Sequence, residues 1–349
     1  MNNIIHKRDY CNEISILKLI FSVIVVLYHY YYGIGAMGLF PFRKGYLGVE
    51  FFFIVSGFLM MKKIDTTDIG AKRYTINKAK RIYPHFIIAL TMMFLLRLVG
   101  IISKEGFAVK NIALNFIRYI LEALFLVEIR LPFNDRLLGQ AWYISAMVIV
   151  GFFMFYILRR AGKQLVWLLF LLSGVFIFMS FKQYGDFHLN FQYLNIYKGF
   201  GLYYGLIRGF CGMSMGCTAY VLAGKLKTVS GAKALALKIA DLAVLIAILM
   251  IICIGTIPDM DYVVIALIFV LVTLTFAKQS FFANIYDCIN IRKIEEFSLA
   301  IYMYYIIVVV TQLSYLKIHN IYLYFALTML LSVIMIFVVR KIQESNIRK

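Results

Sequence analysis

The first long apolar run, residues 14–32, carries two side chains that could do chemistry, Lys18 and His29. They lie eleven residues apart, so a helix presents both on one face, about 16 Å apart along its axis. An ionisable group inside a bilayer costs several kcal/mol, and such a pair therefore indicates function. The alternative is that Lys18 extends to the membrane interface while His29 satisfies a neighbouring backbone group. The spacing predicts a cation at one membrane depth and a proton-accepting imidazole at another.

Two further charged residues fall at a depth close to that of His29. Glu50 lies in the second apolar run, 46–61, and Arg208 lies in the outer half of the run 202–223. A carboxylate that accepts a hydrogen bond from one imidazole nitrogen makes the other nitrogen a better base. An arginine in the membrane also needs a partner, so Glu50 could pair with either His29 or Arg208. Three glycines in the stretch 45–60 would let a neighbouring helix approach closely: Gly45, Gly48 and Gly57.

The most basic segment of the chain is the predicted loop 62–84. Its cluster of Lys78, Lys80 and Arg81 directly precedes the next apolar run. Such a cluster could hold a phosphate-rich ligand, with arginine giving planar, bidentate contacts. It could equally fix the topology of the chain or bind anionic lipid headgroups.

The elements that must position these residues are transmembrane helices. The chain has 349 residues, of which 63% are hydrophobic and 15% charged, and its mean hydropathy is +0.85. These values are typical of a polytopic membrane protein rather than a soluble domain. Apolar segments of spanning length predict an all-α fold with about ten transmembrane helices and no appended soluble domain, at 14–32, 46–61, 82–102, 141–158, 165–180, 202–223, 239–255, 262–277, 297–316 and 321–339.

The distribution of positive charge decides between ten spans and eleven. An additional apolar stretch, 111–128, is interrupted by charged residues. If it crossed the membrane, the basic segments 159–163 and 225–238 would fall outside, against the positive-inside rule. We therefore expect ten spans with both termini in the cytoplasm, and we expect 111–128 to form an interfacial or re-entrant helix on the outer face. The formal charge of +19 is then assigned to cytoplasmic loops, and no nucleic-acid partner is expected.

Three motifs occur together in the first quarter of the chain. They are Lys18-x10-His29, the block GxxGVxxFFxxSGFL from Gly45 to Leu59, and Arg-Ile-Tyr-Pro at 81–84. In this combination the sequence resembles the acyltransferase-3 family of integral membrane proteins, over essentially its whole length. The resemblance implies a ten-span enzyme that O-acylates surface polysaccharides with an acyl-CoA donor.

The resemblance also implies roles for individual residues. His29 matches the essential histidine of the first span, and Lys18 matches the basic residue before it. Arg81 matches the arginine of the cytosolic motif, and Arg208 matches the later intramembrane arginine.

Three positions depart from the family pattern. Lys18 stands where arginine is usual, which keeps the charge but loses the bidentate fork. Met147 stands where many members have a glutamate, and Tyr305 stands where the ninth span often has a histidine. If that glutamate matters in relatives, Glu50 is the available replacement here.

The sequence therefore predicts a membrane O-acyltransferase, most simply an O-acetyltransferase, that acts on a cell-surface or lipid-linked polysaccharide. Acetyl-CoA is the expected donor, bound by Lys18, Lys78 and Arg81, and no metal is expected. His29 is the expected base, oriented by Glu50, with Arg208 stabilising the oxyanion. The expected location is the bacterial inner membrane. Two alternatives stay open: a transporter or flippase of a glycan or lipid intermediate, and a scaffold in a polysaccharide-assembly complex.

Overall fold

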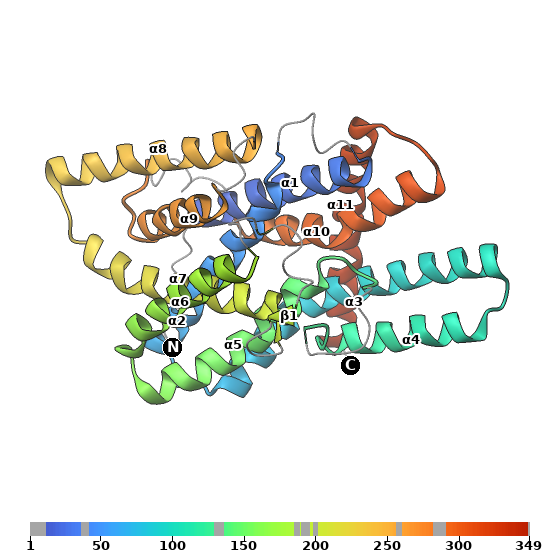
Figure 1. The fold of residues 1–349 in the computed structure, drawn as a ribbon, viewed down its shortest axis with the longest axis horizontal. Coiled ribbons are helices and arrows are strands. Elements are labelled where there is room, and N and C mark those ends of the chain that lie inside the picture. The colour runs from blue at the N-terminus through green and yellow to red at the C-terminus, as the bar shows by residue number, and fades with distance from the viewer. Residues whose placement is uncertain are drawn as a thin grey trace.

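The computed structural model describes residues 12–35, 42–128, 136–184, 189, 196–197, 202–255, 260–281 and 291–347. In these ranges the chain is helical apart from turns and one two-stranded hairpin, and Figure 1 shows the arrangement of the helices. The elements are α1 (Asn12–Gly33), the 3-10 turn η1 (Gly45–Leu47), α2 (Gly48–Thr66), α3 (Ala71–Glu105), α4 (Val109–Ala123), α5 (Ala141–Ala161), α6 (Leu165–Tyr184), β1 (Ile196–Tyr197), β2 (Leu202–Tyr203), α7 (Tyr204–Leu226), α8 (Gly231–Ile254), α9 (Asp261–Phe276), α10 (Ile291–Val310), the π turn η5 (Thr311–Tyr315) and α11 (Ile321–Ile347).

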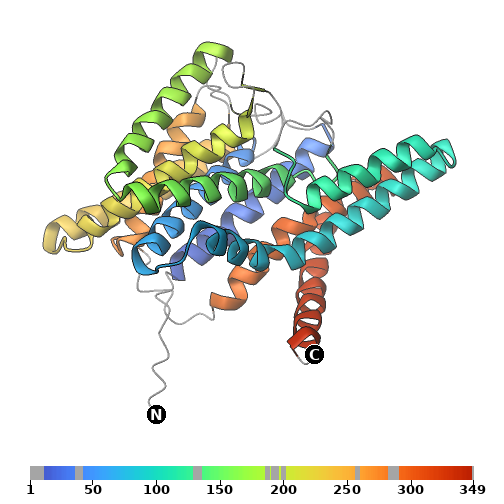
Figure 2. The same cartoon turned by 90° about the horizontal axis from the view of Figure 1, so that it is seen from below.

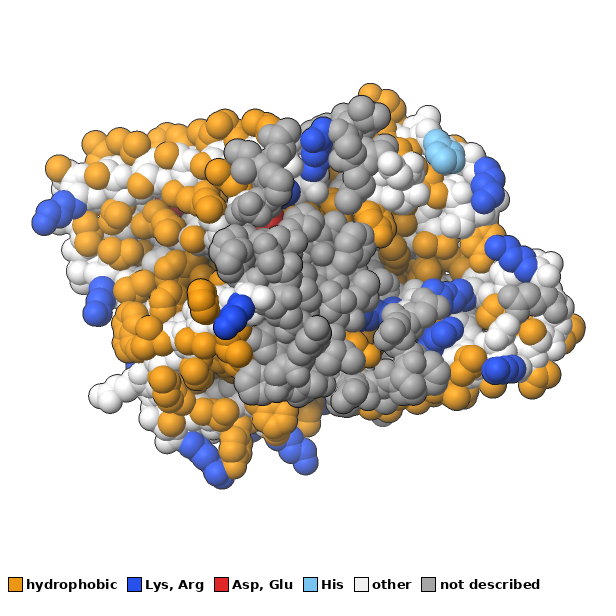
Figure 3. All heavy atoms as spheres, viewed as in Figure 1, with side chains coloured by type: hydrophobic (Ala, Val, Ile, Leu, Met, Phe, Trp, Pro, Cys, Tyr) orange, Lys and Arg blue, Asp and Glu red, His pale blue; other side chains and the backbone are white. Residues whose placement is uncertain are grey.

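The described surface is that of a membrane protein. Seven helices are long and apolar enough to cross a bilayer: α1, α3, α5, α7, α8, α10 and α11. Apolar side chains cover much of the outer surface along α8 in Figure 3, where Leu235, Ile239 and Met250 are more than half exposed. Exposed apolar area on this scale is unfavourable in water and favourable in lipid. The all-α, multi-pass fold is thus confirmed, and the other three predicted spans fall on the helices α2, α6 and α9.

Helices α1 and α10 pack side by side and run parallel. Lys18 of α1 bonds Glu295 of α10, and eleven residues later the His29 ring lies 5.0 Å from the Tyr305 ring. The partners advance together along both helices, which only a parallel pair allows. Two parallel spans must be joined by an odd number of crossings. If α2, α6 and α9 cross the membrane as predicted, then α2, α3 and α5 to α9 supply an odd number of crossings, and the packing agrees with the prediction that α4 does not cross.

Glycines bring α2 and α7 into backbone contact. A Cβ atom on Gly57 would strike the carbonyl of Met213, and one on Gly216 would strike the carbonyl of Ile54. Small residues allow this close approach between membrane helices. The prediction that Gly57 serves helix packing is confirmed, and the contact fixes which face of α2 meets α7.

The predicted loop 62–84 is wrong in its boundaries, because most of it is helical. Helix α2 continues to Thr66, and α3 begins at Ala71 and runs through Pro84 without interruption. The lysines, arginines and alanines before Pro84 are good helix formers, and membrane helices tolerate an internal proline. The basic cluster therefore lies on the first turns of a continuous helix.

The stretch 111–128 forms α4, which folds back beside α3 as a helical hairpin (Figures 1 and 2). Glu122, one of the charged residues that interrupt this stretch, is buried. It accepts hydrogen bonds from the backbone N–H groups of Leu137 and Leu138, at 2.5 and 3.0 Å. Burial raises the pKa of Glu122 to about 7, although these bonds and nearby arginines act in the opposite direction. Glu122 thus holds the segment that leads into α5.

Candidate active site

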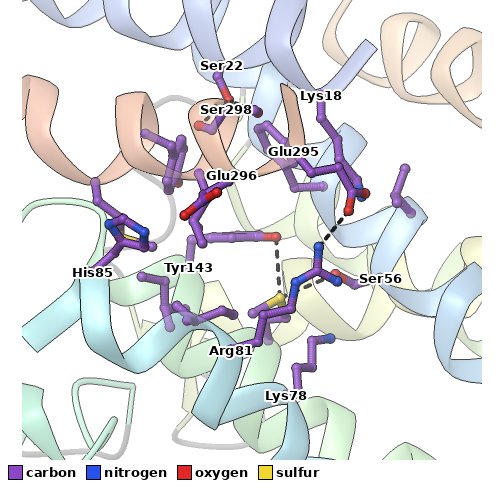
Figure 4. Close-up of a pocket in the computed structure, with 18 of the residues that line it drawn as sticks. Lys18, Ser22, Ser56, Lys78, Arg81, His85, Tyr143, Glu295, Glu296 and Ser298 are labelled. Atoms are coloured by element: carbon purple, nitrogen blue, oxygen red, sulfur yellow. Dashed lines mark hydrogen bonds and ion pairs between the residues drawn. The ribbon is translucent and has the colours of Figure 1, made fainter. Parts of the chain in front are cut away.

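A cavity of about 810 Å³ opens between α1, α3 and α10 (Figure 4). We call it the donor-side cavity. It brings together the three residues expected to bind the donor, Lys18, Lys78 and Arg81. Its charged lining comprises five cations and two carboxylates: Lys18, Lys78, Arg81, Lys293, Arg340, Glu295 and Glu296. The excess of positive charge favours an anionic ligand.

Glu295 connects two of these cations. Its carboxylate accepts from Lys18 Nζ at 2.6 Å and from Arg81 Nη2 at 2.7 Å, and Figure 4 shows it between them. The side chain of Arg81 is 64% exposed, whereas that of Glu295 is only 10% exposed. The sequence reasoning missed Glu295. Its signal was an acidic pair, Glu295 and Glu296, at the start of an apolar run in an otherwise basic chain.

The inner wall of the donor-side cavity contains Met147, one of the three positions expected to depart from the family pattern. Ser56 Oγ donates to the Met147 sulfur at 3.2 Å, and Tyr143 Oη donates to it at 3.4 Å. A thioether accepts hydrogen bonds weakly and carries no charge. The cavity thus ends in an uncharged wall, with no carboxylate at this position.

A second cavity of about 390 Å³, the His29 cavity, lies further along α1 and is lined by both His29 and Arg208. The Nδ1 atom of His29 lies 2.8 Å from the carbonyl oxygen of Val25. Because a carbonyl only accepts, Nδ1 carries the proton and Nε2 keeps its lone pair. The backbone contact given above as the alternative for His29 is therefore present, and it leaves Nε2 able to act as a base.

Glu50 pairs with Arg208, so the expected His29–Glu50 dyad is wrong. Arg208 Nε donates to Glu50 Oε1 at 2.7 Å, and both residues are almost fully buried. A buried guanidinium requires a counter-charge, and the close α2–α7 packing brings Glu50 to it. Arg208 also donates to the carbonyl of Leu189 at 3.2 Å and stacks over Trp142 at 4.9 Å. Glu50 thus lies behind Arg208 and holds it at the wall of the His29 cavity.

Comparison with known proteins identifies the family. The model of an acyltransferase domain, that of the acyltransferase 3 family, matches residues 12–340. The chain belongs to the acyltransferase 3 family. It is therefore an acyl-transferring membrane enzyme, and the acyl donor is a ligand that the family implies.

One more distant relative matches part of this acyltransferase. ORF330 of Acidianus two-tailed virus, described as a proposed acetyltransferase, is 33% identical over 92 residues. The match covers 26% of this chain and 27% of the relative, so the chain spans about a quarter of the length of that protein. No solved structure matches the acyltransferase. In the described ranges, no group of three or more His, Cys, Asp or Glu side chains is placed to hold a metal ion.

Proposed function

We propose that this acyltransferase transfers an acetyl group from acetyl-CoA to a hydroxyl of a cell-surface or lipid-linked glycan. One observation carries the proposal: a cation-lined cavity and a histidine-lined cavity occupy successive parts of the same parallel helix pair, α1 and α10. The first suits a polyanionic donor, and the second is lined by both a base and a buried guanidinium. In this assignment the donor-side cavity faces the cytoplasm of a bacterium and the inner membrane is the site of action.

The donor-side cavity supports a coenzyme A ligand. Coenzyme A carries several phosphate charges, which match the excess positive lining. Arg81, at the exposed rim, offers the planar fork that binds phosphate in a bidentate manner. Glu295 holds Lys18 and Arg81 close together, so a phosphate can exchange with the carboxylate at Arg81 while Lys18 keeps its partner. Lys78 lies on the same face of α3, one helical turn before Arg81, and adds a third positive charge.

The His29 cavity supports acyl transfer by general base catalysis. His29 Nε2 removes the proton of the acceptor hydroxyl, whose oxygen then attacks the thioester carbonyl. Arg208 stabilises the negative charge that develops on the carbonyl oxygen. Collapse of the tetrahedral intermediate forms the ester and expels the thiolate, which takes the proton from His29. The imidazole is neutral again at the end of the cycle.

The experiment that tests the proposal replaces His29 by alanine. The His29→Ala variant is expressed in a strain from which the gene for this acyltransferase has been deleted. The surface glycan of that strain should show no O-acetyl signals in its NMR spectrum. The variant should still insert in the membrane, because His29 bonds only its own helix among the described residues. The matched control is His319→Ala, since His319 is exposed and lines neither cavity. Retained O-acetylation in the His29→Ala strain would overturn the assignment.

A further inference from the structure

The donor-side cavity and the His29 cavity meet at one side chain, Tyr302, which lines both. Tyr302 belongs to α10 and lies between Glu295 in the donor-side cavity and Tyr305 beside His29. Phe52 of α2 and Tyr143 of α5 converge on the same point. We call Phe52, Tyr143 and Tyr302 together the aromatic partition.

The three rings of the aromatic partition form a closed triangle. Their centroids are 5.5 Å apart for Phe52 and Tyr302, 6.1 Å for Phe52 and Tyr143, and 5.8 Å for Tyr143 and Tyr302. These separations are those of aromatic rings in direct contact, which leaves no room for a chain of atoms between them. Tyr143 and Tyr302 are less than a tenth exposed, so the rings fill the space where the two cavities would otherwise join.

The backbone beside the partition is held firmly. Gln140 Nε2 donates to the carbonyls of Tyr302 and Met303, at 3.2 and 2.9 Å. This clamp ties the start of α5 to α10 at the level of the partition. With the two helices tied together here, the movement that opens the path is a rotation of a side chain rather than a displacement of the helices.

We propose that the aromatic partition separates the two cavities at rest and that the Tyr302 ring rotates aside to admit the thioester end of the acyl donor to His29. The proposal rests on the proposed function, which has the donor enter on the Lys18 side and react on the His29 side. Tyr302 is the ring that must move, because among the described residues it alone lines both cavities. The partition also selects the acyl group, since a short acyl chain needs a smaller opening than a long one. Phe52, Tyr143 and Tyr302 are thus assigned as positioning and specificity-determining residues.

The first experiment tests the barrier without using enzyme activity. Ser56→Cys places a thiol in the donor-side cavity, and Gly139→Cys places one in the His29 cavity, where the added side chain has room. The probe is the membrane-impermeant reagent 2-(trimethylammonium)ethyl methanethiosulfonate, applied to vesicles of either orientation. The protein without an added cysteine gives the background. The two thiols should be modified from opposite faces of the membrane.

Removal of the Tyr302 ring should then make Gly139→Cys accessible from both faces. With Tyr302→Ala we expect modification from the formerly closed face to accelerate by at least about tenfold, and Phe52→Ala offers a second route if Tyr302→Ala does not fold. Tyr302→Phe, which keeps the ring, and Leu299→Ala, which removes volume one turn away on the donor side, should both stay one-sided. Equal modification from both faces before any ring is removed would overturn the proposal. Unchanged one-sided modification in both alanine variants would also overturn it.

The second experiment measures selection of the acyl group. The ratio of acetyl to hexanoyl transfer should fall about tenfold in Tyr302→Ala, in line with the discrimination that a few methylene groups provide, and should stay unchanged in Tyr302→Phe. An unchanged ratio in Tyr302→Ala and Phe52→Ala would refute the selective role. The labelling result does not depend on acyl transfer, so a wrong proposed function and a wrong partition give different outcomes. If the proposed function is wrong, no acyl products form even with the parent protein. If only the partition is wrong, acyl products form but the labelling does not change as expected.

Discussion

The two cavities of this acyltransferase use charge in opposite ways. On the donor side, cations are partly exposed and share carboxylates, as Lys18 and Arg81 share Glu295. On the His29 side, the ion pair that reaches the cavity wall, Arg208–Glu50, is almost fully buried, and much of the remaining lining is aromatic or aliphatic. Exposed ion pairs are weak and exchange partners easily, whereas a buried pair is costly to disturb. The difference indicates that one side is built to bind and release a ligand, and the other to hold a fixed arrangement.

The largest effect should come from breaking the buried pair. Glu50→Leu or Arg208→Leu leaves one uncompensated charge inside the protein, which costs about 3–5 kcal/mol. We expect either single variant to lose most of its folded fraction in fluorescence-detected size-exclusion chromatography. The double variant Glu50→Leu/Arg208→Leu should recover much of the folded protein, since both charges are gone. It should remain inactive, because the oxyanion has lost its positive partner.

The outcome of these variants decides whether the pair is structural, catalytic or both. Single variants as stable as the parent protein would contradict the buried ion pair. An active double variant would limit Arg208 to a structural role. The contrast with the donor side would then concern protein stability and not the chemical step.

A smaller effect, on binding alone, is expected on the donor side. Lys18→Ala should raise the KM for acetyl-CoA by about tenfold with a minor change in kcat, which is the signature of lost ground-state binding. Lys18→Arg should stay close to the parent, because it keeps the charge that the donor meets. The matched control is Lys233→Ala, at an exposed position outside both cavities. A fall in kcat with an unchanged KM would instead place Lys18 in the chemical step.

The sequence was sufficient for what depends on position along a helix. It placed Lys18 and His29 on one face of α1 and put His29, Glu50 and Arg208 at similar depths, and these expectations agree with the two cavities. It could not decide which partner Glu50 meets. That choice depends on how α2 is turned toward its neighbours, which the contacts of Gly57 and Gly216 determine.

The same limit explains the residues that the sequence did not reveal. Glu295 and Tyr302 matter because α10 runs parallel to α1 and faces both cavities, and no periodicity in one helix reports the identity of its neighbour. The loop predicted before Pro84 failed for a different reason. The predicted spans ended where the apolar residues end, at 61 and 82, whereas α2 and α3 continue as helices into the basic segment between them.

The smallest expected effect concerns the support of the His29 cavity. Glu122 binds the N–H groups of Leu137 and Leu138, directly before the cavity residues Gly139 and Gln140. Its pKa, raised to about 7 by burial, lies above the value near 4.5 of an unfolded carboxyl group. The folded state therefore binds a proton on the Glu122 carboxyl group more tightly than the unfolded state does. The stabilisation that this proton gives at low pH is lost as the pH rises from about 4.5 through 7. We expect the melting temperature of the purified protein to fall by a few degrees between pH 5 and pH 8, and to fall less in Glu122→Gln. Glu344→Gln, at an exposed position on α11, should keep the slope of the parent protein. An equal slope in Glu122→Gln would show that this support does not depend on a proton, and the two sides of the enzyme would then differ in their ion pairs alone.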